Sequence, residues 1–466
     1  MRHINPRTLA KRSLRVLGRI RRNPICICKL RRGTRISNIG VVVQNHLCHG
    51  CGVCYAVCPR LAIHMENSGE EGHFVPVIDE KCINCNLCLR VCPGYDLDLE
   101  KLNEVIFNSQ PENSKVGVYK HSYFGHSNDE DIRYNSASGG LITQILITLL
   151  EEGMIDGALV TSMDPSNPLQ PMSILATTKE EVIEASRSKY CPVTIAEALR
   201  KIFNTEGRYA VVGLPCHIHG IRKAEQVLPH LRGRVVLHFG LLCSHMVGFP
   251  GIHFLLEKKG IDYREVVEMQ YRGRGWPGSM LIKERSGAET TIPLTTGWHS
   301  YWPIFASYFF TPNRCLMCPD QMAEFADMSF GDAWLPESRD DKIGNSVIIT
   351  KNDFADKVLR DVARKHHLVL DNISIDRIEE SQQPNLVFKK VDLGARLGIL
   401  SAKGYKTPNF NPEPMVNSSP LSVLRTFLVL LNYSLSKLII FKRVGLYIPF
   451  PIFRVYNGCF KYLYKI

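Results

Sequence analysis

The chain has 466 residues, of which 16 are cysteine, and a formal net charge of +12. Because this length exceeds the ~100 to 200 residues of one ordinary domain, two or three globular units are expected. Most of the cysteines stand in C-x-x-C groupings of a long chain in which we find no secretory signal. This usage argues against a small, disulfide-stapled secreted protein and favours thiolate ligands in a reducing cytoplasm.

The positive charge lies at the two ends of the chain. Residues 1–35 hold twelve Lys or Arg and no acid, so the remaining 45 bases balance the 45 acids, and no acid follows Glu413. Basic segments that also carry apolar residues suit an acidic partner or a peripheral contact with the anionic inner face of a membrane. Nucleic acid is the competing partner, but no recognised nucleic-acid module accompanies the charge, so none is expected.

Composition shifts divide the chain into parts. A basic arm (1–35) precedes a segment of cysteine repeats (36–100), and a polar connector at about 101–117 marks a domain boundary. An α/β unit then extends from 116 to about 395, because apolar runs at 157–161, 209–213 and 235–239 alternate with helical patterns. Its clearest helix is predicted over 140–152, with Gly153 just beyond its end.

A Pro-rich stretch, 407–414, separates the α/β unit from a basic, apolar tail (415–466). Ser419 and Pro420 predict the start of a helix in this tail. Its leucines recur at helical spacing, at Leu424, Leu428, Leu431, Leu435 and Leu438. Residues 427–441 are mostly apolar but fall short of the ~20 residues that a spanning helix needs, so no membrane span is predicted.

Two copies of the pattern C-x2-C-x2-C-x3-C-P indicate a bacterial-type ferredoxin module with two [4Fe-4S] clusters. In this pattern three close thiolates hold one cluster and the fourth cysteine ligates the other. A pair of zinc knuckles is the alternative, but zinc does not explain the triple spacing or the prolines. The predicted ligand sets are Cys48, Cys51, Cys54 and Cys92 for one cluster, and Cys82, Cys85, Cys88 and Cys58 for the other.

The motifs further along resemble the beta subunit family of coenzyme F-420 hydrogenases and dehydrogenases, which are flavin iron-sulfur reductases. The resemblance covers roughly 116–390 and divides into an N-terminal part (116–200) and a C-terminal part (201–395). The residue after Cys216 is His217, where relatives usually have glutamine. The motifs are Ser136-Ala-Ser-Gly-Gly140, Ser188-Lys-Tyr190, Val212-Gly-Leu-Pro-Cys216-His-Ile-His-Gly220, Leu242-Cys243, Cys315-Leu-Met-Cys318-Pro-Asp320 and Ala326-Asp-Met-Ser-Phe-Gly-Asp-Ala-Trp334.

The resemblance implies FAD and a third [4Fe-4S] cluster. A Ser-x-Ser-Gly-Gly turn that opens a helix suits a pyrophosphate, although an ordinary capped helix with closely packed glycines explains it as well. The third cluster would use Cys216, Cys243, Cys315 and Cys318; the alternative is that they are buried cysteines without metal. The expected flavin-binding residues are Ser136, Ser138, Gly139, Gly140, Ser188, Lys189, Tyr190, Gly213 and Pro215.

Several other residues have alternative roles. His217 and His219 are weak catalytic candidates as proton donors, and packed histidines are the other interpretation. The loop Tyr271–Gly278 either covers the flavin, grips an anionic substrate, or is an ordinary exposed turn. Asp320, Asp327 and Asp332 are expected to be turn and capping residues, and Cys26 and Cys28 are not expected to be ligands.

The sequence as a whole predicts an α+β protein: an N-terminal ferredoxin-like 2[4Fe-4S] domain followed by a larger α/β flavin-binding domain. By resemblance, the expected function is an oxidoreductase that passes electrons between clusters and FAD and exchanges a hydride with coenzyme F-420. One alternative is a ferredoxin-dependent reductase of a biosynthetic intermediate, without the deazaflavin. Another is a non-catalytic electron-transfer adaptor. Either role implies a redox partner protein, such as ferredoxin or a catalytic subunit.

Overall fold

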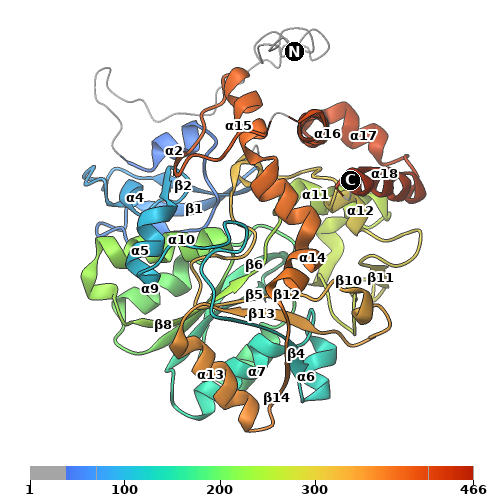
Figure 1. Cartoon of the computed structure of the whole chain (residues 1–466). Coiled ribbons are helices and arrows are strands. Elements are labelled where there is room, and N and C mark those ends of the chain that lie inside the picture. The colour runs from blue at the N-terminus through green and yellow to red at the C-terminus, as the bar shows by residue number, and fades with distance from the viewer. Residues whose placement is uncertain (1–37, 70, 418, 465–466) are drawn as a thin grey trace.

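The computed structural model describes residues 38–69, 71–417 and 419–464 (Figure 1). The predictions for the basic arm, with Cys26 and Cys28, lie outside these residues. The first described part is a small module of short helices around a two-stranded antiparallel sheet. Its elements are α2 (Gly40–Gln44), α3 (Val53–Ala56), β1 (Ile63–Ser68), β2 (His73–Ile78), α4 (Leu87–Arg90), β3 (Asp96–Asp98) and α5 (Leu99–Phe107).

An eight-stranded mixed sheet forms the centre of the larger part. Its middle strands β12, β8, β7 and β5 are parallel, and antiparallel strands flank them on both sides. In spatial order the strands are β14 (Leu368–Asn372), β4 (His121–Ser127), β13 (Ser346–Thr350), β12 (Met328–Asp332), β8 (Val235–Leu241), β7 (Tyr209–Gly213), β5 (Gly157–Asp164) and β6 (Asn167–Ala176).

Helices cover both faces of this sheet. Apolar residues of α7 (Leu141–Glu151) and α13 (Asp353–Arg364) pack on one face, with α6 (Glu130–Asn135) and α8 (Lys179–Glu184) nearby. The other face packs against α9 (Ala196–Asn204) and α10 (Pro215–Val227). Val53 and Ala56 of α3 join that second cluster. The small module is therefore seated on α9 and α10, beside the carboxyl end of β7.

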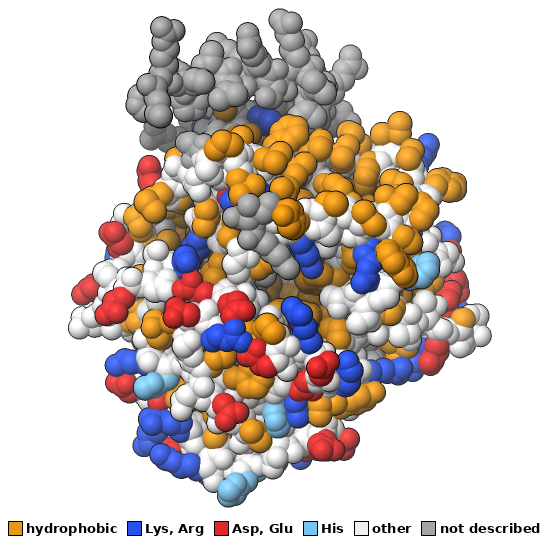
Figure 2. All heavy atoms as spheres, turned by 45° about the vertical axis from the view of Figure 1, so that its right-hand side comes forward, with side chains coloured by type: hydrophobic (Ala, Val, Ile, Leu, Met, Phe, Trp, Pro, Cys, Tyr) orange, Lys and Arg blue, Asp and Glu red, His pale blue; other side chains and the backbone are white. Residues whose placement is uncertain are grey.

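A second layer lies beside the sheet and includes the tail. The three-stranded sheet β9 (Val266–Gln270), β10 (Ser279–Glu284) and β11 (Glu289–Pro293) shares an apolar cluster with α11 (Phe249–Lys258), α12 (Trp302–Phe305) and α18 (Phe450–Tyr462). Large apolar side chains are also exposed over α16 (Pro420–Lys437), α17 (Ile439–Gly445) and α18 (Figure 2). Among the described residues no single helix is long and apolar enough to cross a bilayer; α16 and α17 pass that test together but are bent by 91°.

The remaining elements are short turns and the helices that connect the core to the tail. They are η1 (Pro229–Leu231), η2 (Tyr263–Glu265), η3 (Asn313–Met317), η4 (Pro336–Ser338), α14 (Ile375–Leu386), the π-helix η5 (Val387–Val391), α15 (Leu393–Ala402) and β15 (Asn409–Asn411).

The predicted mixed helix and sheet class is confirmed, and so are several predicted elements. The helix expected over 140–152 is α7, and Gly153 follows it with φ +63°. Ser419 caps α16 by accepting a hydrogen bond from the Ser422 N–H at 3.2 Å. The apolar runs at 157–161, 209–213 and 235–239 lie in β5, β7 and β8.

Two segments expected to be simple connectors are structured. Residues 101–107 of the polar connector belong to helix α5, because Asp98 caps the helix and buried Leu102 anchors it. The Pro-rich stretch contains β15, which pairs in parallel with β3 of the small module. The sequence analysis missed both because short polar segments owe their structure to tertiary contacts more than to propensity.

Candidate functional site

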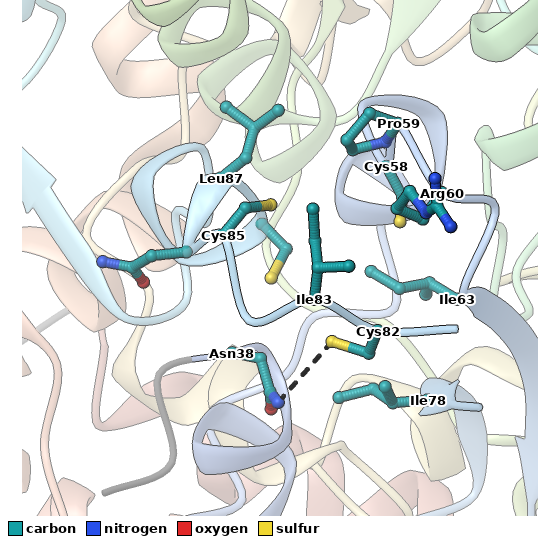
Figure 3. Close-up of a pocket in the computed structure, with 12 residues that line it drawn as sticks. Asn38, Cys58, Pro59, Arg60, Ile63, Ile78, Cys82, Ile83, Cys85 and Leu87 are labelled. Carbon is teal, nitrogen blue, oxygen red and sulfur yellow. Dashed lines mark hydrogen bonds between the residues drawn. The ribbon is translucent and has the colours of Figure 1, made fainter. Parts of the chain in front are cut away.

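The outer cysteine set comprises Cys58, Cys82, Cys85 and Cys88. These four side chains line one hollow beneath the surface of the small module, together with Pro59 and Leu87 (Figure 3). The Ala62 N–H donates to the Cys58 Sγ at 3.4 Å, and the Asn38 amide lies 3.9 Å from the Cys82 Sγ. Cys85 is exposed, so this set is the one nearest to solvent.

The inner cysteine set comprises Cys48, Cys51, Cys54 and Cys92. Their side chains lie close enough for the charge of Cys92 to raise the pKa of the other three thiols, after the larger effect of burial. Burial and Cys92 together raise the pKa of Cys51 to about 12. Because buried thiolates are this unfavourable, the set holds four thiolates only with a compensating cation among them.

The third cysteine set comprises Cys216, Cys243, Cys315 and Cys318. Cys216 follows β7 in the first turn of α10, and Cys243 stands two residues beyond β8, so parallel neighbours bring them together. Cys315 and Cys318 come from the turn η3 and the residue after it. All four line one pocket, which also contains His49, Val193, Leu214, Pro215, His217, His245, Met246, Asp320 and Lys389.

The three sets form a row with the inner set in the middle. The charge of Cys88, from the outer set, contributes to the raised pKa of Cys54. After burial, the charge of Cys51 is the largest cause of the raised pKa of Cys216. Close contact at this junction requires Gly52, whose φ is +86° and where a Cβ would lie 2.3 Å from the Thr194 hydroxyl.

The cysteines are spaced for a cluster more than for one ion. Across residues 38–464, apart from 70 and 418, no three His, Cys, Asp or Glu side chains are close enough together to share a single metal ion. A zinc ion would draw four sulfurs to within ~2.3 Å of one point, whereas a four-iron cluster holds each thiolate on a different iron. All three sets are therefore candidate cluster sites.

Two buried cations contact the cysteine sets, and the sequence analysis missed both. Lys389 in the π-helix η5 is 1% exposed. Burial alone would lower its pKa, but the charges of Cys318, Cys243 and Cys315 raise the pKa above the usual lysine value. Arg314 is also 1% exposed and donates to the Pro93 carbonyl at 3.1 Å, which ties the third set to the inner one. Arg314 stands directly before Cys315, so the sequence could have indicated that it lies near the cysteine set. Nothing in the sequence indicated this for Lys389.

The serine and glycine turn before α7 fits a ligand only in part. Ser138 Oγ lies 2.7 Å from Ser346 Oγ, and the Gly139 N–H donates to the same hydroxyl at 3.0 Å. A Cβ on Gly139 would lie 2.6 Å from the Gly125 carbonyl, so close packing explains that glycine. Ser136 Oγ, in contrast, is buried without a partner among the described residues, which leaves a hydroxyl available to a ligand.

A buried ion pair lies beside the predicted flavin residue Tyr190. Arg272 is 1% exposed and binds Asp332 through two hydrogen bonds, of 2.8 and 2.5 Å, while also donating to the Tyr190 hydroxyl at 3.0 Å. The Trp276 indole N–H donates to Asp332 at 2.8 Å. The loop Tyr271–Gly278 is therefore not an ordinary exposed turn. Asp332 is an ion-pair partner rather than the expected turn residue.

Cations gather near the Ser136 turn. Arg187 donates to the Asn135 carbonyl at 2.9 Å, and burial followed by the nearby charge of Arg274 lowers its pKa. Lys189 donates to the carbonyls of Ala185 and Ser186 at 2.6 Å each, and burial lowers its pKa to about 7. Two neighbouring guanidinium groups are mutually unfavourable unless an anion lies between them.

The two histidines that were weak catalytic candidates are held by structural hydrogen bonds. His217 Nδ1 accepts from the Leu214 N–H at 3.2 Å and Nε2 donates to the Val193 carbonyl at 3.3 Å, while burial lowers its pKa to about 4. His219 Nε2 lies 2.8 Å from Asp320. Asp320 also accepts from the Glu324 N–H at 2.9 Å, as expected of a turn residue, whereas Asp327 is buried and binds Arg222 at 2.9 Å, so it is an ion-pair partner.

Comparison with protein families gives the identity of these parts. The model of the 4Fe-4S dicluster domain matches residues 47–95. The models of the coenzyme F-420 hydrogenase/dehydrogenase beta subunit match residues 122–200, for its N-terminal part, and 206–376, for its C terminus. The chain belongs to this beta subunit family. The beta subunit match covers the sheet and Cys216, Cys243, Cys315 and Cys318, whereas η5 with Lys389 and the tail helices lie beyond it.

Several of the relatives are coenzyme F-420-linked oxidoreductases or their subunits. The chain is 27% identical over 318 residues to a subunit of the F(420)H(2) dehydrogenase of Methanosarcina mazei, covering 67% of this chain and 81% of that one. It is 27% identical to the beta subunit of the coenzyme F-420 hydrogenase of Methanothermobacter thermautotrophicus, over 53% of this chain and 82% of the relative. It is 25% identical to the coenzyme F-420-dependent sulfite reductase of Methanocaldococcus jannaschii, over 75% of this chain but only 50% of that enzyme.

Proposed function

We propose that the chain is an iron-sulfur flavoprotein that moves electrons between an organic hydride carrier and a redox partner protein through three [4Fe-4S] clusters. The observation that carries the proposal is the row of three cysteine sets, which runs from the exposed Cys85 through the buried inner set to Cys216. A row of this kind is useful only if a donor stands at one end and an acceptor at the other.

The residues of the third set fit a cluster. Four thiols converge on one pocket, and the buried ammonium of Lys389 would offset part of the negative charge of a cluster with four thiolates. Burial raises the pKa of the Cys243 thiol and the Lys389 charge lowers it, but burial has the larger effect and the pKa is raised to about 12. Iron bound to the sulfurs would supply the remaining positive charge.

The proposed flavin site lies where the Ser136 turn, the Arg187 to Tyr190 segment and the Tyr271 to Gly278 loop meet. The unpartnered Ser136 hydroxyl and the adjacent Arg187 and Arg274 suit a pyrophosphate. When bound, FAD would convert between one-electron transfer and a two-electron, hydride-type exchange. Residues 190–193 lead from this site to the third set, because Val193 lines the pocket of those cysteines.

The proposed hydride partner is coenzyme F-420, by analogy with the coenzyme that the names of the relatives contain. The protein partner would exchange electrons at the outer set, where Cys85 is exposed and Ile83 and Leu61 present apolar surface beside it. A transient encounter between redox proteins needs a short distance for electron transfer, and an exposed cysteine set provides it. The interfaces of such encounters typically bury a small area.

Enzymatic assay tests this proposal. Reduced coenzyme F-420 should bleach the flavin of the anaerobically purified chain and should then support reduction of a one-electron dye. Bleaching by a ferredoxin reductase system but not by reduced F-420 would favour the ferredoxin-dependent reductase without deazaflavin. Full iron content without flavin would leave the electron-transfer adaptor.

Replacing Lys389 with methionine is expected to make the third cluster harder to reduce. A buried positive charge favours the more negative, reduced state, so its loss should lower the reduction potential by on the order of 100 mV. Redox titration followed by electron paramagnetic resonance measures this shift. Lys389→Arg keeps the charge and is the matched control. A potential unchanged in Lys389→Met, with the cluster still bound, would contradict the proposed role.

Replacing Arg187 and Arg274 with glutamine is expected to weaken FAD binding. Each charge-assisted contact to a phosphate contributes roughly 1.5 to 3 kcal/mol, so losing both should raise the dissociation constant at least about a hundredfold. Fluorescence titration of the deflavinated protein measures the constant. Arg285→Gln, on the exposed end of the β10 hairpin, provides the control. Equal affinities in the two variants would place the flavin elsewhere.

A further inference from the structure

The tail helices present an inverted distribution of polarity. The side of α16 that packs on the protein buries polar residues, namely Ser422, Arg425, Thr426, Asn432 and Ser436, together with three apolar ones. Its outward side exposes Val423, Leu424 and Phe427. An ordinary surface helix has the opposite arrangement, with the apolar stripe inward and the polar face in water. In the leucine stripe predicted from the sequence, Leu424 and Leu438 at the two ends are exposed, and the three leucines between them are half-buried.

Three of the five inward polar residues, Arg425, Asn432 and Ser436, have specific partners on neighbouring segments, which fixes the orientation of α16. Arg425 forms two hydrogen bonds of 2.8 Å with Asp392, and the Asn432 amide donates to the Ser307 carbonyl at 2.8 Å. The Phe310 N–H donates to Ser436 Oγ at 2.9 Å. Because these bonds would be lost if the helix turned over, the outward apolar face is a fixed property of the fold.

The exposed apolar surface continues from α16 onto the next two helices. Ile439 and Ile440 are 71% and 68% exposed in α17, and Tyr447, just after it, is 86% exposed. Figure 2 shows apolar side chains gathered over this end of the molecule, with no acidic side chain among them in that view. We call this surface the tail face; its exposed members are Val423, Leu424, Phe427, Leu438, Ile439, Ile440, Val444, Tyr447, Ile452, Val455 and Tyr462.

The charges that the tail helices themselves carry are all positive. Lys442 and Arg443 stand on α17 between exposed isoleucines and Val444, and Arg454 on α18 lies over the exposed ring of Trp298, 5.4 Å from its centroid. No acid occurs after Glu413. Apolar side chains flanked by Lys and Arg, with Trp and Tyr at the edge, have the composition of helices that lie in a membrane interface.

We infer that the tail face seats the protein on an anionic lipid bilayer, with α16, α17 and α18 lying along its surface. α16 and α17 meet at a 91° bend, and both carry exposed apolar side chains. A second copy of the chain is a poorer occupant, because a symmetric contact would place two basic faces against each other. This inference is independent of the proposed flavin chemistry and would bring a redox enzyme to the membrane surface.

Vesicle flotation of the full, iron-loaded chain tests the inference. The chain should float with vesicles that contain phosphatidylglycerol and only weakly with pure phosphatidylcholine vesicles. The double variant Ile439→Asp with Ile440→Asp should bind the anionic vesicles at least about tenfold less, because charged side chains resist burial among the acyl chains. The control is Phe354→Asp with Val369→Asp, which changes two exposed apolar residues on α13 and β14, at the opposite end of the molecule (Figure 1).

The controls separate this face from other sources of binding. Unchanged circular dichroism and iron content would show that each variant is folded. If the wild type and the Ile439 and Ile440 double variant floated equally, another segment such as the basic arm would be responsible and the inference would be overturned. It would equally be overturned if the wild type bound no vesicles and formed a dimer that the double variant lost.

Discussion

The variant Cys216→Ala is expected to lose about four irons per chain while keeping the other two clusters, because its sulfur is one of the four that converge on the third pocket. The flavin should still be bleached by the hydride donor. Electrons should no longer reach the outer set, since the third cluster would be the only proposed relay between the flavin and the inner set, whose Cys51 acts on the pKa of Cys216. Iron analysis and dye reduction on the same sample measure the two effects.

Cys191→Ala is the matched control for this substitution. Cys191 is buried, at 2% exposed, whereas Cys216 is half-buried; Cys191 belongs to the apolar cluster around Phe249 and lines neither cysteine pocket. Its replacement should leave the iron content unchanged. Equal iron content in Cys216→Ala and Cys191→Ala would mean that the third set binds no cluster.

The second large expected effect is a loss of iron from the small module, where the fourth cysteine of each motif is predicted to ligate the cluster of the other motif, an arrangement called crossed ligation here. Cys92→Ala is expected to destroy the inner cluster, although Cys92 belongs to the second sequence motif, because its side chain adjoins Cys48 and Cys51. Adding Cys51→Ala to it should cost no further iron, since both residues serve one cluster. Adding Cys85→Ala should remove about four more irons, since Cys85 lines the outer hollow.

The pattern of the double variants distinguishes crossed from uncrossed ligation. If each motif held its own cluster, Cys92→Ala with Cys85→Ala would lose one cluster and Cys92→Ala with Cys51→Ala would lose two. Cys459→Ala removes an exposed cysteine that lines neither pocket and controls for the loss of a thiol as such. Circular dichroism identifies any variant that fails to fold.

The sequence predicted three cysteine sets, and their role as cluster ligands stays a prediction. For Cys58 and Cys92 the spacing alone was sufficient, because a duplicated motif constrains where the fourth cysteine points. For the third set the order of motifs was needed, since about 100 residues separate Cys216 from Cys315. The structure brings them together by a general property of parallel sheets: Cys216 and Cys243 follow neighbouring strands, and the carboxyl ends of those strands meet at one edge.

Other features of the site were not accessible from the sequence. Lys389 stands in a Lys-Lys pair that looks like ordinary surface charge, 71 residues after Cys318, and only the π-helix turns it inward. Arg272 and Asp332 are 60 residues apart, and their pairing depends on how a loop folds across the sheet edge. The tail helix was located correctly, but its exposed face was not predicted, because apolar spacing gives a helix and says nothing of which side meets the protein.

Quantitation of iron, sulfide and flavin on one anaerobically purified sample tests the central proposal most directly. Three [4Fe-4S] clusters and one FAD predict about twelve irons, about twelve sulfides and one flavin per chain. About eight irons without flavin would contradict the proposal, because that result would leave the third cysteine set without a cluster and the proposed hydride site without its cofactor.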